Sequence, residues 1–218
     1  NYRLSPKATF PDHLVDLKRA LAWTREHAQE YGGDPNFIVV TGGSAGGHLT
    51  ALVALTQNDA EYQPEFEGAD TSVYAAVPYY GVYDFTGRNH VRNKVDEEGM
   101  RRFLERSVMK TKLRDDPEGW AKASPLDRIT PDDPPMFVIH GRNDTLVPVA
   151  EARHFVEKLR ATSNEPVVYA ELPGAQHAFD VFPSIRTAHV IRAIERYVDY
   201  MFTRYRHRER AERGEVVA

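Results

Sequence analysis

Three side chains of this sequence have the types and the order that nucleophilic attack on a carbonyl carbon requires. Ser44 stands in G-G-S-A-G at residues 42–46, which matches the pattern G-x-S-x-G, and Asp144 and His177 follow in that order. A serine hydroxyl attacks a carbonyl only when a base accepts its proton and a third group holds that base in place. The sequence therefore predicts Ser44 as nucleophile, His177 as base and Asp144 as the acid that orients the base.

The segment around the serine has the surroundings that such a nucleophile needs. An apolar, β-branched run at residues 37–41 precedes it, and a predicted helix at residues 45–57 follows it. A tight turn between strand and helix lifts the hydroxyl above the sheet. We expect this turn to need very small residues two positions before and two positions after the serine, at Gly42 and Gly46. The backbone N–H of Ala45 is the expected donor to the oxyanion.

Other glycine-rich loops and other titratable residues fit this chemistry less well. A dinucleotide loop, G-x-G-x-x-G, would need glycine at Ser44 or Ala45, and the G-K-[ST] of a phosphate loop is absent. His48, one turn after the serine, and His140, at the end of a predicted strand, are expected to support the site. Three further acids are less suited to orient the base, since two precede a predicted strand and one follows the histidine too closely: Asp132, Asp133 and Asp180.

Strand-like and helix-like segments alternate along the chain, which indicates how these residues are positioned. The predicted strands cover residues 37–41, 73–79, 135–140 and 167–172, and the predicted helices cover residues 12–31, 45–57, 149–161 and 184–205. A short extended piece is expected at residues 1–4. This order predicts an α/β fold with helices on both faces of a mostly parallel sheet. Asp144 and His177 each come just after a predicted strand, so both should lie with Ser44 at the carboxyl edge of that sheet.

One polar stretch, residues 84–131, is too long for an ordinary connection. Its apolar pattern around Phe103 and Met109 predicts at least one amphipathic helix. We interpret the stretch as an excursion that is either a surface decoration or a wall of the substrate pocket. The second interpretation makes Phe85, Phe103 and Met109 the candidate substrate-binding residues.

Composition restricts the remaining functions. The 218 residues suit one domain, expected at residues 1–203, followed by a charged tail at residues 204–218 that should extend the last helix. The net charge of −4 argues against a nucleic-acid partner. The absence of cysteine leaves the compartment open, no metal-binding motif is present, and acyl transfer needs no cofactor, so we expect neither a metal nor a cofactor. No apolar run approaches the ~20 residues of a transmembrane segment.

The motifs resemble those of the hormone-sensitive-lipase-like esterases and lipases. Residues 1–11 are similar to the family's Y-R-L-[AS]-P…F-P segment, residues 31–35 to the approach to its nucleophile strand, residues 43–49 to its nucleophile turn, and Asp144 with L-V-P at 146–148 to its acid loop. The likeness runs to about residue 200. It implies the α/β-hydrolase fold and hydrolysis of small carboxylic esters with short to medium acyl chains. Gly43 departs from the family pattern, because many members carry an acidic residue there.

Two elements of that family have no counterpart in the sequence. The H-G-G-G loop, which supplies part of the oxyanion hole, and an N-terminal lid would both precede residue 1. We therefore expect N-terminal strands and the lid to be missing from this chain. A separate N-terminal segment or chain would then supply the rest of the oxyanion hole. Association into homo-oligomers also remains open.

Two other functions remain open at this point. The same three residues on the same fold also serve peptidases and amidases, because a Ser-His-Asp triad does not distinguish an ester from an amide. The chain could instead be a non-catalytic hydrolase-fold module that binds small ligands or protein partners. Retention of all three residues argues against a pure binding module, which has no need of the set.

Overall fold

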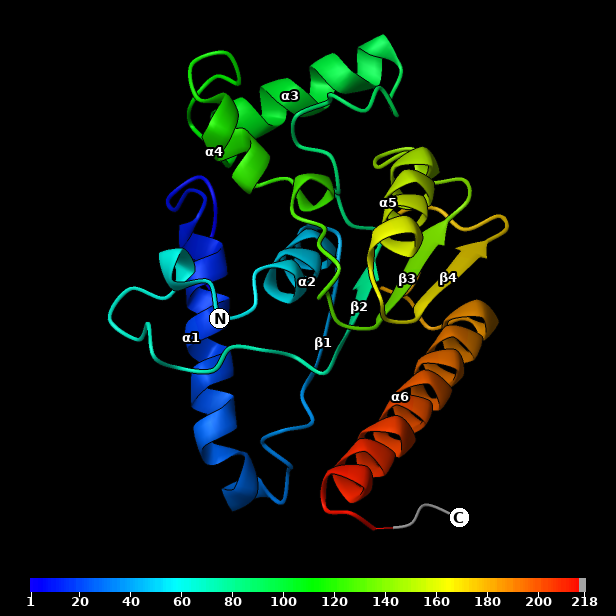
Figure 1. Ribbon diagram of the computed structural model, residues 1–218. Coiled ribbons are helices and arrows are strands. Elements are labelled where there is room, and N and C mark those ends of the chain that lie inside the picture. Colours follow the sequence, from blue (N-terminus) through cyan, green and yellow to red (C-terminus); the bar gives the residue numbers. More distant parts are fainter. Residues whose placement is uncertain (216–218) are drawn as a thin grey trace.

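A four-stranded parallel sheet lies at the centre of the computed structural model, which describes residues 1–215 (Figure 1). The strands follow one another across the sheet in chain order and all pair in parallel. They are β1 (Val39–Gly43), β2 (Ala75–Tyr79), β3 (Met136–Gly141) and β4 (Val167–Leu172). The predicted α/β class with a mostly parallel sheet is confirmed. Because all four strands run the same way, the loops that leave them gather at one edge.

Helices precede, connect and follow these strands. They are α1 (Asp12–His27), α2 (Ala45–Leu55), α3 (Lys94–Ser107), α4 (Pro117–Lys122), α5 (Val149–Thr162) and α6 (Ile185–Glu212). Short 3₁₀ turns occur at Ala28–Tyr31, Ala60–Tyr62 and Pro125–Asp127. Among the described helices, none combines the length and the apolar character that crossing a bilayer would take.

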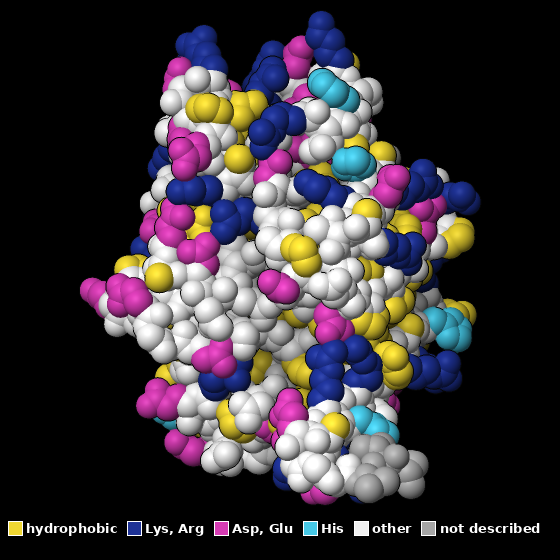
Figure 2. Space-filling view, in the orientation of Figure 1, with side chains coloured by type: hydrophobic (Ala, Val, Ile, Leu, Met, Phe, Trp, Pro, Cys, Tyr) yellow, Lys and Arg dark blue, Asp and Glu magenta, His cyan; other side chains and the backbone are white. Residues whose placement is uncertain are grey.

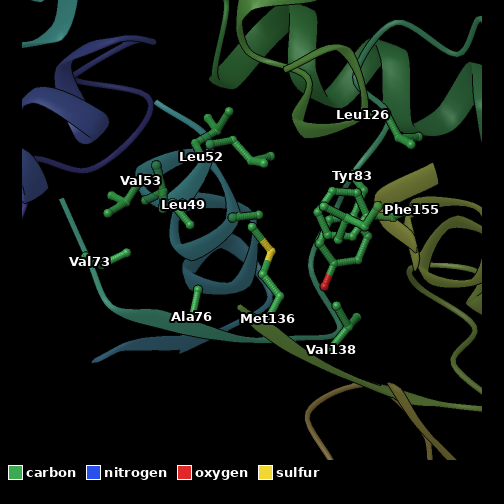
Figure 3. Packing of buried hydrophobic residues seen from close by; sticks show 14 of the residues in the cluster. Leu49, Leu52, Val53, Val73, Ala76, Tyr83, Leu126, Met136, Val138 and Phe155 are labelled. Atoms are coloured by element: carbon green, nitrogen blue, oxygen red, sulfur yellow. The ribbon is translucent and has the colours of Figure 1, made fainter. Parts of the chain in front are cut away.

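Alternate residues of the inner strands point to opposite faces and build two cores. Ala76, Met136 and Val138 pack with Leu52 of α2 and Phe155 of α5 (Figure 3). Their sequence neighbours point the other way and pack on α6: Ala75, Val77, Phe137 and Ile139 against Val190, Tyr197 and Met201. Helices thus cover both faces of the sheet, as the sequence predicts.

The first strand is displaced from its predicted position. The apolar run predicts a strand at residues 37–41, but the parallel register pairs Gly42 with Pro78 and Gly43 with Tyr79, so β1 continues through the glycines. Phe37 lies before the first residue of the strand, and its ring packs on aromatic rings of α6. Residues 1–4, expected as an extended piece, do not join the sheet and instead lie along α1, where Arg3 binds Asp16 at 2.8 Å.

The last helix, α6, continues through residue 203 to Glu212. Arg204 and Arg208 bind the two carboxylate oxygens of Glu165, at 3.0 and 2.6 Å, and fasten this part of the helix to the loop before β4. Arg208 therefore pairs with Glu165 and not with Glu212, the partner that helical spacing suggests. Residues 216–218 of the predicted tail lie outside the described residues.

Basic and acidic side chains are interspersed over the face shown in Figure 2.

The excursion at residues 84–131 has a core of its own. It contains α3 and α4, which lie at one end of the molecule in Figure 1, and the amphipathic helix predicted here is confirmed by α3. Five apolar side chains bury one another between these helices: Phe85, Leu104, Met109, Trp120 and Ala123. Phe103, also on α3, lies outside this core and is 58% exposed.

A buried ion pair joins the excursion to α5. Arg92 Nε donates to Glu151 Oε1 at 2.6 Å, and the second oxygen, Oε2, accepts the N–H groups of Tyr83 and Asp84 at 3.0 and 3.2 Å. Arg92 also donates to the carbonyl of Asp84 at 2.7 Å. Both side chains are almost completely buried, at 1% and 0% exposure. This pair fixes the path of the chain as it leaves β2.

Replacing Arg92 with alanine is expected to lower the free energy of unfolding by about 3–5 kcal/mol, because it leaves the buried Glu151 carboxylate without its cation. Urea unfolding followed by circular dichroism measures this change. Arg88→Ala is the matched control: Arg88 binds Asp127 at 2.8 Å but is 61% exposed, so its loss should cost at most about 1 kcal/mol. Equal losses in the two variants would contradict the role assigned to Glu151.

Candidate active site

Ser44 stands at the turn between β1 and α2 in a backbone conformation that is rare for a residue with a side chain. Its φ is 56° and its ψ is −118°. Its N–H donates to the carbonyl of Tyr79 at 3.1 Å, and its own carbonyl accepts the N–H of His48 at 3.0 Å. Strained residues of this kind occur where the surroundings over-determine them, commonly at functional sites. In this conformation the Ser44 hydroxyl lies within hydrogen-bond distance of His177.

The glycines that make this turn fit are not the pair expected from sequence. A Cβ on Gly42 would lie 2.7 Å from the carbonyl oxygen of Gly46, so Gly42 is required as predicted. A Cβ on Gly46 would meet no atom within 4 Å, so the requirement predicted for Gly46 is wrong. A Cβ on Gly47 would instead overlap the carbonyl oxygen of Tyr79. The close approach comes from β2, which α2 crosses at this point.

Alanine at these two neighbouring positions is expected to have opposite effects on stability. Gly46→Ala should raise the free energy of unfolding by up to ~1 kcal/mol, because alanine favours a helix and the site is open. Gly47→Ala should lower it by about 1–3 kcal/mol, because α2 must move away from β2. Denaturant unfolding of the two variants tests this pair. A tolerated alanine at Gly47 would show that α2 and β2 are not in close contact.

His177 lies between Ser44 and Asp144 and forms hydrogen bonds with both. Its Nε2 is 2.8 Å from Ser44 Oγ, and its Nδ1 is 2.7 Å from Asp144 Oδ2. The carboxylate side chain is fully buried and the imidazole is 14% exposed. A carboxylate only accepts, so Nδ1 carries the hydrogen and Nε2 is left to accept from the serine hydroxyl. This arrangement can move a proton from Ser44 to His177.

The other oxygen and the surroundings of Asp144 hold its carboxylate in place. Oδ1 accepts the N–H groups of Leu146 and Val147 at 2.9 and 2.8 Å. His140 Nε2 lies 3.3 Å from Oδ2 and 2.9 Å from the carbonyl of Val147, the supporting position expected for it. Burial alone would raise the pKa of Asp144, but hydrogen bonds from His140, His177 and Val147 lower it well below its ordinary value. Asp144 therefore stays ionised.

The competing titratable residues have other partners. His48 Nε2 lies 2.8 Å from the carbonyl of Ala123, and burial lowers the pKa of His48 to about 4, so this histidine stays neutral. Asp133 accepts from Thr130 before β3, at the edge of the sheet away from Ser44. Within residues 1–215, no three His, Asp or Glu side chains gather as a metal site would require.

Two of the three candidate substrate-binding residues, Phe85 and Met109, belong to one cluster, and Phe103 lies outside it. Phe85 stacks on His48 with ring centroids 4.2 Å apart, which places it beside the helix that follows Ser44. Met109 is buried in the core of the excursion. Phe103 faces solvent on α3. The structure therefore gathers Phe85 and Met109 in one cluster and leaves Phe103 outside it.

Two features of the site were not identified from the sequence. Tyr80, just after β2, packs on His177 with ring centroids 4.7 Å apart, and its hydroxyl donates to Asp180. The Tyr79-Tyr80-Gly81 run at the carboxyl end of a predicted strand was the available signal, because it lies at the same edge as Ser44. The other feature is the close approach at Gly47. The Ala45 N–H, which the sequence did predict as a donor, stands in the first turn of α2, where it has no intrahelical partner.

Curated relatives of this chain carry names that fit such a site. The probable carboxylic ester hydrolase LipM of Mycobacterium tuberculosis (strain ATCC 25618 / H37Rv) is 55% identical over 198 residues, which is 91% of this chain and 45% of LipM. The esterase LipQ of the same strain is 47% identical, over 94% of this chain and 47% of LipQ. The chain thus spans about half the length of the curated relatives it matches.

Solved structures give the same fold. Esterase 2 of the planctomycete Thermogutta terrifontis is 26% identical with a TM-score of 0.70, over 89% of this chain and 65% of that one. A truncated carbohydrate esterase from gut microbiota has a TM-score of 0.75 at 23% identity, over 93% of this chain and 72% of that one, a likeness of fold alone. Residues 1–159 match the BD-FAE family. The expected resemblance to esterases of the α/β-hydrolase fold is confirmed, and the chain belongs to the BD-FAE family.

Proposed function

We propose that this chain carries the catalytic residues of a carboxylic ester hydrolase that acts on small-molecule esters. The observation that carries the proposal is the continuous set of hydrogen bonds from Ser44 through His177 to Asp144, at 2.8 and 2.7 Å. The names of the relatives, esterases and carboxylic ester hydrolases, support the same reaction. No observation favours an amide over an ester as the bond that is cleaved.

The proposed reaction has two acyl-transfer steps. Ser44 Oγ attacks the ester carbonyl while His177 Nε2 accepts its proton, and the resulting imidazolium is stabilised by Asp144. When the tetrahedral intermediate collapses, the alcohol leaves with the proton from His177 and the acyl group stays on Ser44. A water molecule, deprotonated by the same nitrogen, then attacks the acyl carbon, and the carboxylic acid is released as Ser44 regains its proton.

The oxyanion of each intermediate needs hydrogen-bond donors. The Ala45 N–H at the start of α2 is one donor, supported by the positive end of the helix dipole. We infer that a second donor comes from a segment or chain outside these 218 residues. One missing donor costs about 10²–10³-fold in kcat. The 218-residue chain alone should therefore be slower by this factor than a polypeptide extended at its N-terminus, and equal rates would refute the second donor.

Short acyl groups are the proposed substrates. Solved structures of the Thermogutta terrifontis esterase contain propionate and butyrate. We expect this chain to prefer p-nitrophenyl esters of similar length. Phe85, Phe103 and Met109 remain predicted pocket residues. Among them Phe85 has the strongest support, because it packs on the helix that begins at the nucleophile.

Covalent labelling tests the function directly. A fluorophosphonate probe should modify the protein once, and mass spectrometry of its peptides should locate the adduct on Ser44. A panel of p-nitrophenyl esters and aminoacyl-nitroanilides then identifies the bond that is cleaved. Hydrolysis of anilides but not of esters would favour a peptidase or amidase. Absence of both labelling and hydrolysis, in the N-terminally extended polypeptide as well, would favour a binding module.

A further inference from the structure

Tyr80 lies between the nucleophile turn and the histidine loop and contacts both. We propose that Tyr80, held by Asp180, positions the imidazole of His177 against Ser44. This inference rests on the proposed function, because it assumes that His177 is the base. The Tyr80 hydroxyl binds Asp180, and its ring contacts the side of the imidazole, so Tyr80 is a positioning residue that acts through His177.

The backbone at the end of β2 fixes where the Tyr80 ring can go. The Tyr80 N–H donates to the carbonyl of Ile139 at 2.8 Å, so the residue remains attached to β3 just beyond the strand. Its φ is 30°, in the left-handed region that residues with side chains seldom adopt. Its side chain is buried, with 3% of the residue exposed. A buried ring on a backbone anchored to the sheet is a rigid surface for its neighbours.

One neighbour is the imidazole of His177. The two rings meet nearly edge to face, with an interplanar angle of 61° and centroids 4.7 Å apart. The hydrogen bond from Nδ1 to Asp144 holds one nitrogen of the imidazole, but rotation about the Cα–Cβ and Cβ–Cγ bonds of His177 would still move Nε2 away from Ser44. A rigid ring against its side restricts this rotation. Nε2 then stays directed at Ser44.

The other neighbour is the nucleophile turn itself. A Cβ on Gly43, the residue before Ser44, would lie 2.6 Å from the Tyr80 hydroxyl and 2.9 Å from its Cζ. Only glycine therefore leaves room for the tyrosine at this position. Tyr80 thus contacts the segment that carries the nucleophile on one side and the base on the other, so it can set the distance between them.

Asp180 completes the arrangement. Its Oδ1 accepts the Tyr80 hydroxyl, and Phe179 packs on the Tyr80 ring with centroids 5.5 Å apart. Burial and, secondly, the bond to Asp180 raise the pKa of Tyr80, so the phenol keeps its proton and remains a donor. Asp180 is three residues from His177 in sequence. Bound to Tyr80, its Oδ1 is engaged and does not compete with Asp144 for the imidazole.

Steady-state kinetics on p-nitrophenyl acetate tests the positioning role with a matched pair of tyrosines. Tyr80→Phe removes only the hydroxyl, and Asp180→Ala removes its acceptor, while Asp180→Asn keeps an acceptor oxygen. Tyr205→Phe is the control, because Tyr205 is also buried and donates to a carboxylate, Asp34 Oδ2, at 2.9 Å, near the opposite edge of the sheet. Thermal unfolding of every variant measures the loss of stability that both tyrosines share.

We expect Tyr80→Phe and Asp180→Ala each to lower kcat about tenfold with KM unchanged, and the double variant to be no worse than either. Asp180→Asn should recover most of the activity, and Tyr205→Phe should keep the kcat of the wild type. In the ¹H spectrum, the Nδ1 proton of His177 should exchange faster with water in Tyr80→Phe but not in Tyr205→Phe.

Equal kcat values for Tyr80→Phe and Tyr205→Phe would overturn the proposal, as would strictly additive losses in the double variant. Ser44→Ala, measured in parallel, separates the two hypotheses. If Ser44→Ala keeps wild-type hydrolysis, the proposed function fails. If Ser44→Ala is inactive while Tyr80→Phe behaves like its control, only the positioning role fails.

Discussion

Replacing Ser44 with alanine is expected to lower kcat for p-nitrophenyl acetate by about 10⁶-fold, because no acyl-enzyme can form without the hydroxyl. KM should change little, since the hydroxyl contributes to the transition state and not to the binding of the ester. The measurement is initial-rate hydrolysis with the p-nitrophenolate released per active site. Pre-steady-state traces with excess ester should also lose any initial burst of p-nitrophenolate that acylation produces in the wild type.

A serine away from the site provides the comparison. Ser163 Oγ accepts the N–H of Glu165 at 3.1 Å, in the loop between α5 and β4 and so at the amino edge of the sheet. Ser163→Ala should cost some stability and leave kcat as it is. If Ser44→Ala retained more than about one part in 10² of the activity, another residue would have to be the nucleophile.

Asp144→Asn is expected to lower kcat by about 10⁴-fold with the fold preserved. The amide has the shape of the carboxylate but cannot stabilise the imidazolium that forms when His177 accepts the proton. Its NH₂ group would also favour the wrong tautomer of the ring if it faces Nδ1. Rates at saturating p-nitrophenyl acetate measure the loss. The control is Asp133→Asn, because Asp133 is buried to 3% exposure but belongs to the loop before β3. Similar kcat losses in both variants would contradict the role of Asp144.

The same substitution has a consequence for stability that depends on pH. The pKa of Asp144 in the folded protein is lowered, so its ionised form stabilises the fold above the ordinary pKa of about 4. This contribution is lost as the pH falls from about 4 towards the lowered pKa of the folded state. The difference in unfolding free energy between wild type and Asp144→Asn should therefore shrink in acid. Urea unfolding between pH 7 and the most acidic pH at which both remain folded measures it, and a difference that grows in acid would contradict the lowered pKa.

The proximity of Ser44, Asp144 and His177 could be expected from local patterns. Each residue follows an apolar, β-branched run. In a parallel sheet the residues that follow the strands lie at its carboxyl edge, and this does not depend on the conformation of the connections between the strands. The supporting position of His140 follows from the same logic, since it ends the strand before Asp144. Patterns with a period of two or 3.6 residues therefore suffice to bring these four residues to one edge of the sheet.

Contacts between distant segments could not be read from those patterns. The close neighbour of Gly47 is the carbonyl of Tyr79, and the neighbour of Gly43 is the ring of Tyr80. Both belong to β2 and the residue after it. The pairing of β1 with β2 brings Tyr80 to Gly43, and the packing of α2 on β2 brings the Tyr79 carbonyl to Gly47. The displaced start of β1 has the same origin, because Phe37 packs on α6, a helix far away in sequence. Local propensity describes elements, and packing determines which of their residues touch.

The conformation of Ser44 has a cost that every copy of this fold bears. A side-chain-bearing residue at φ 56° and ψ −118° is disfavoured by about 1–3 kcal/mol, whereas glycine adopts such a backbone freely. Selection for the stability of the folded state alone would therefore favour glycine at this position, and the nucleophilic hydroxyl would be lost. A chain that keeps the hydroxyl therefore has a smaller free energy of unfolding than the glycine variant would have, and this loss of stability arises at a single residue.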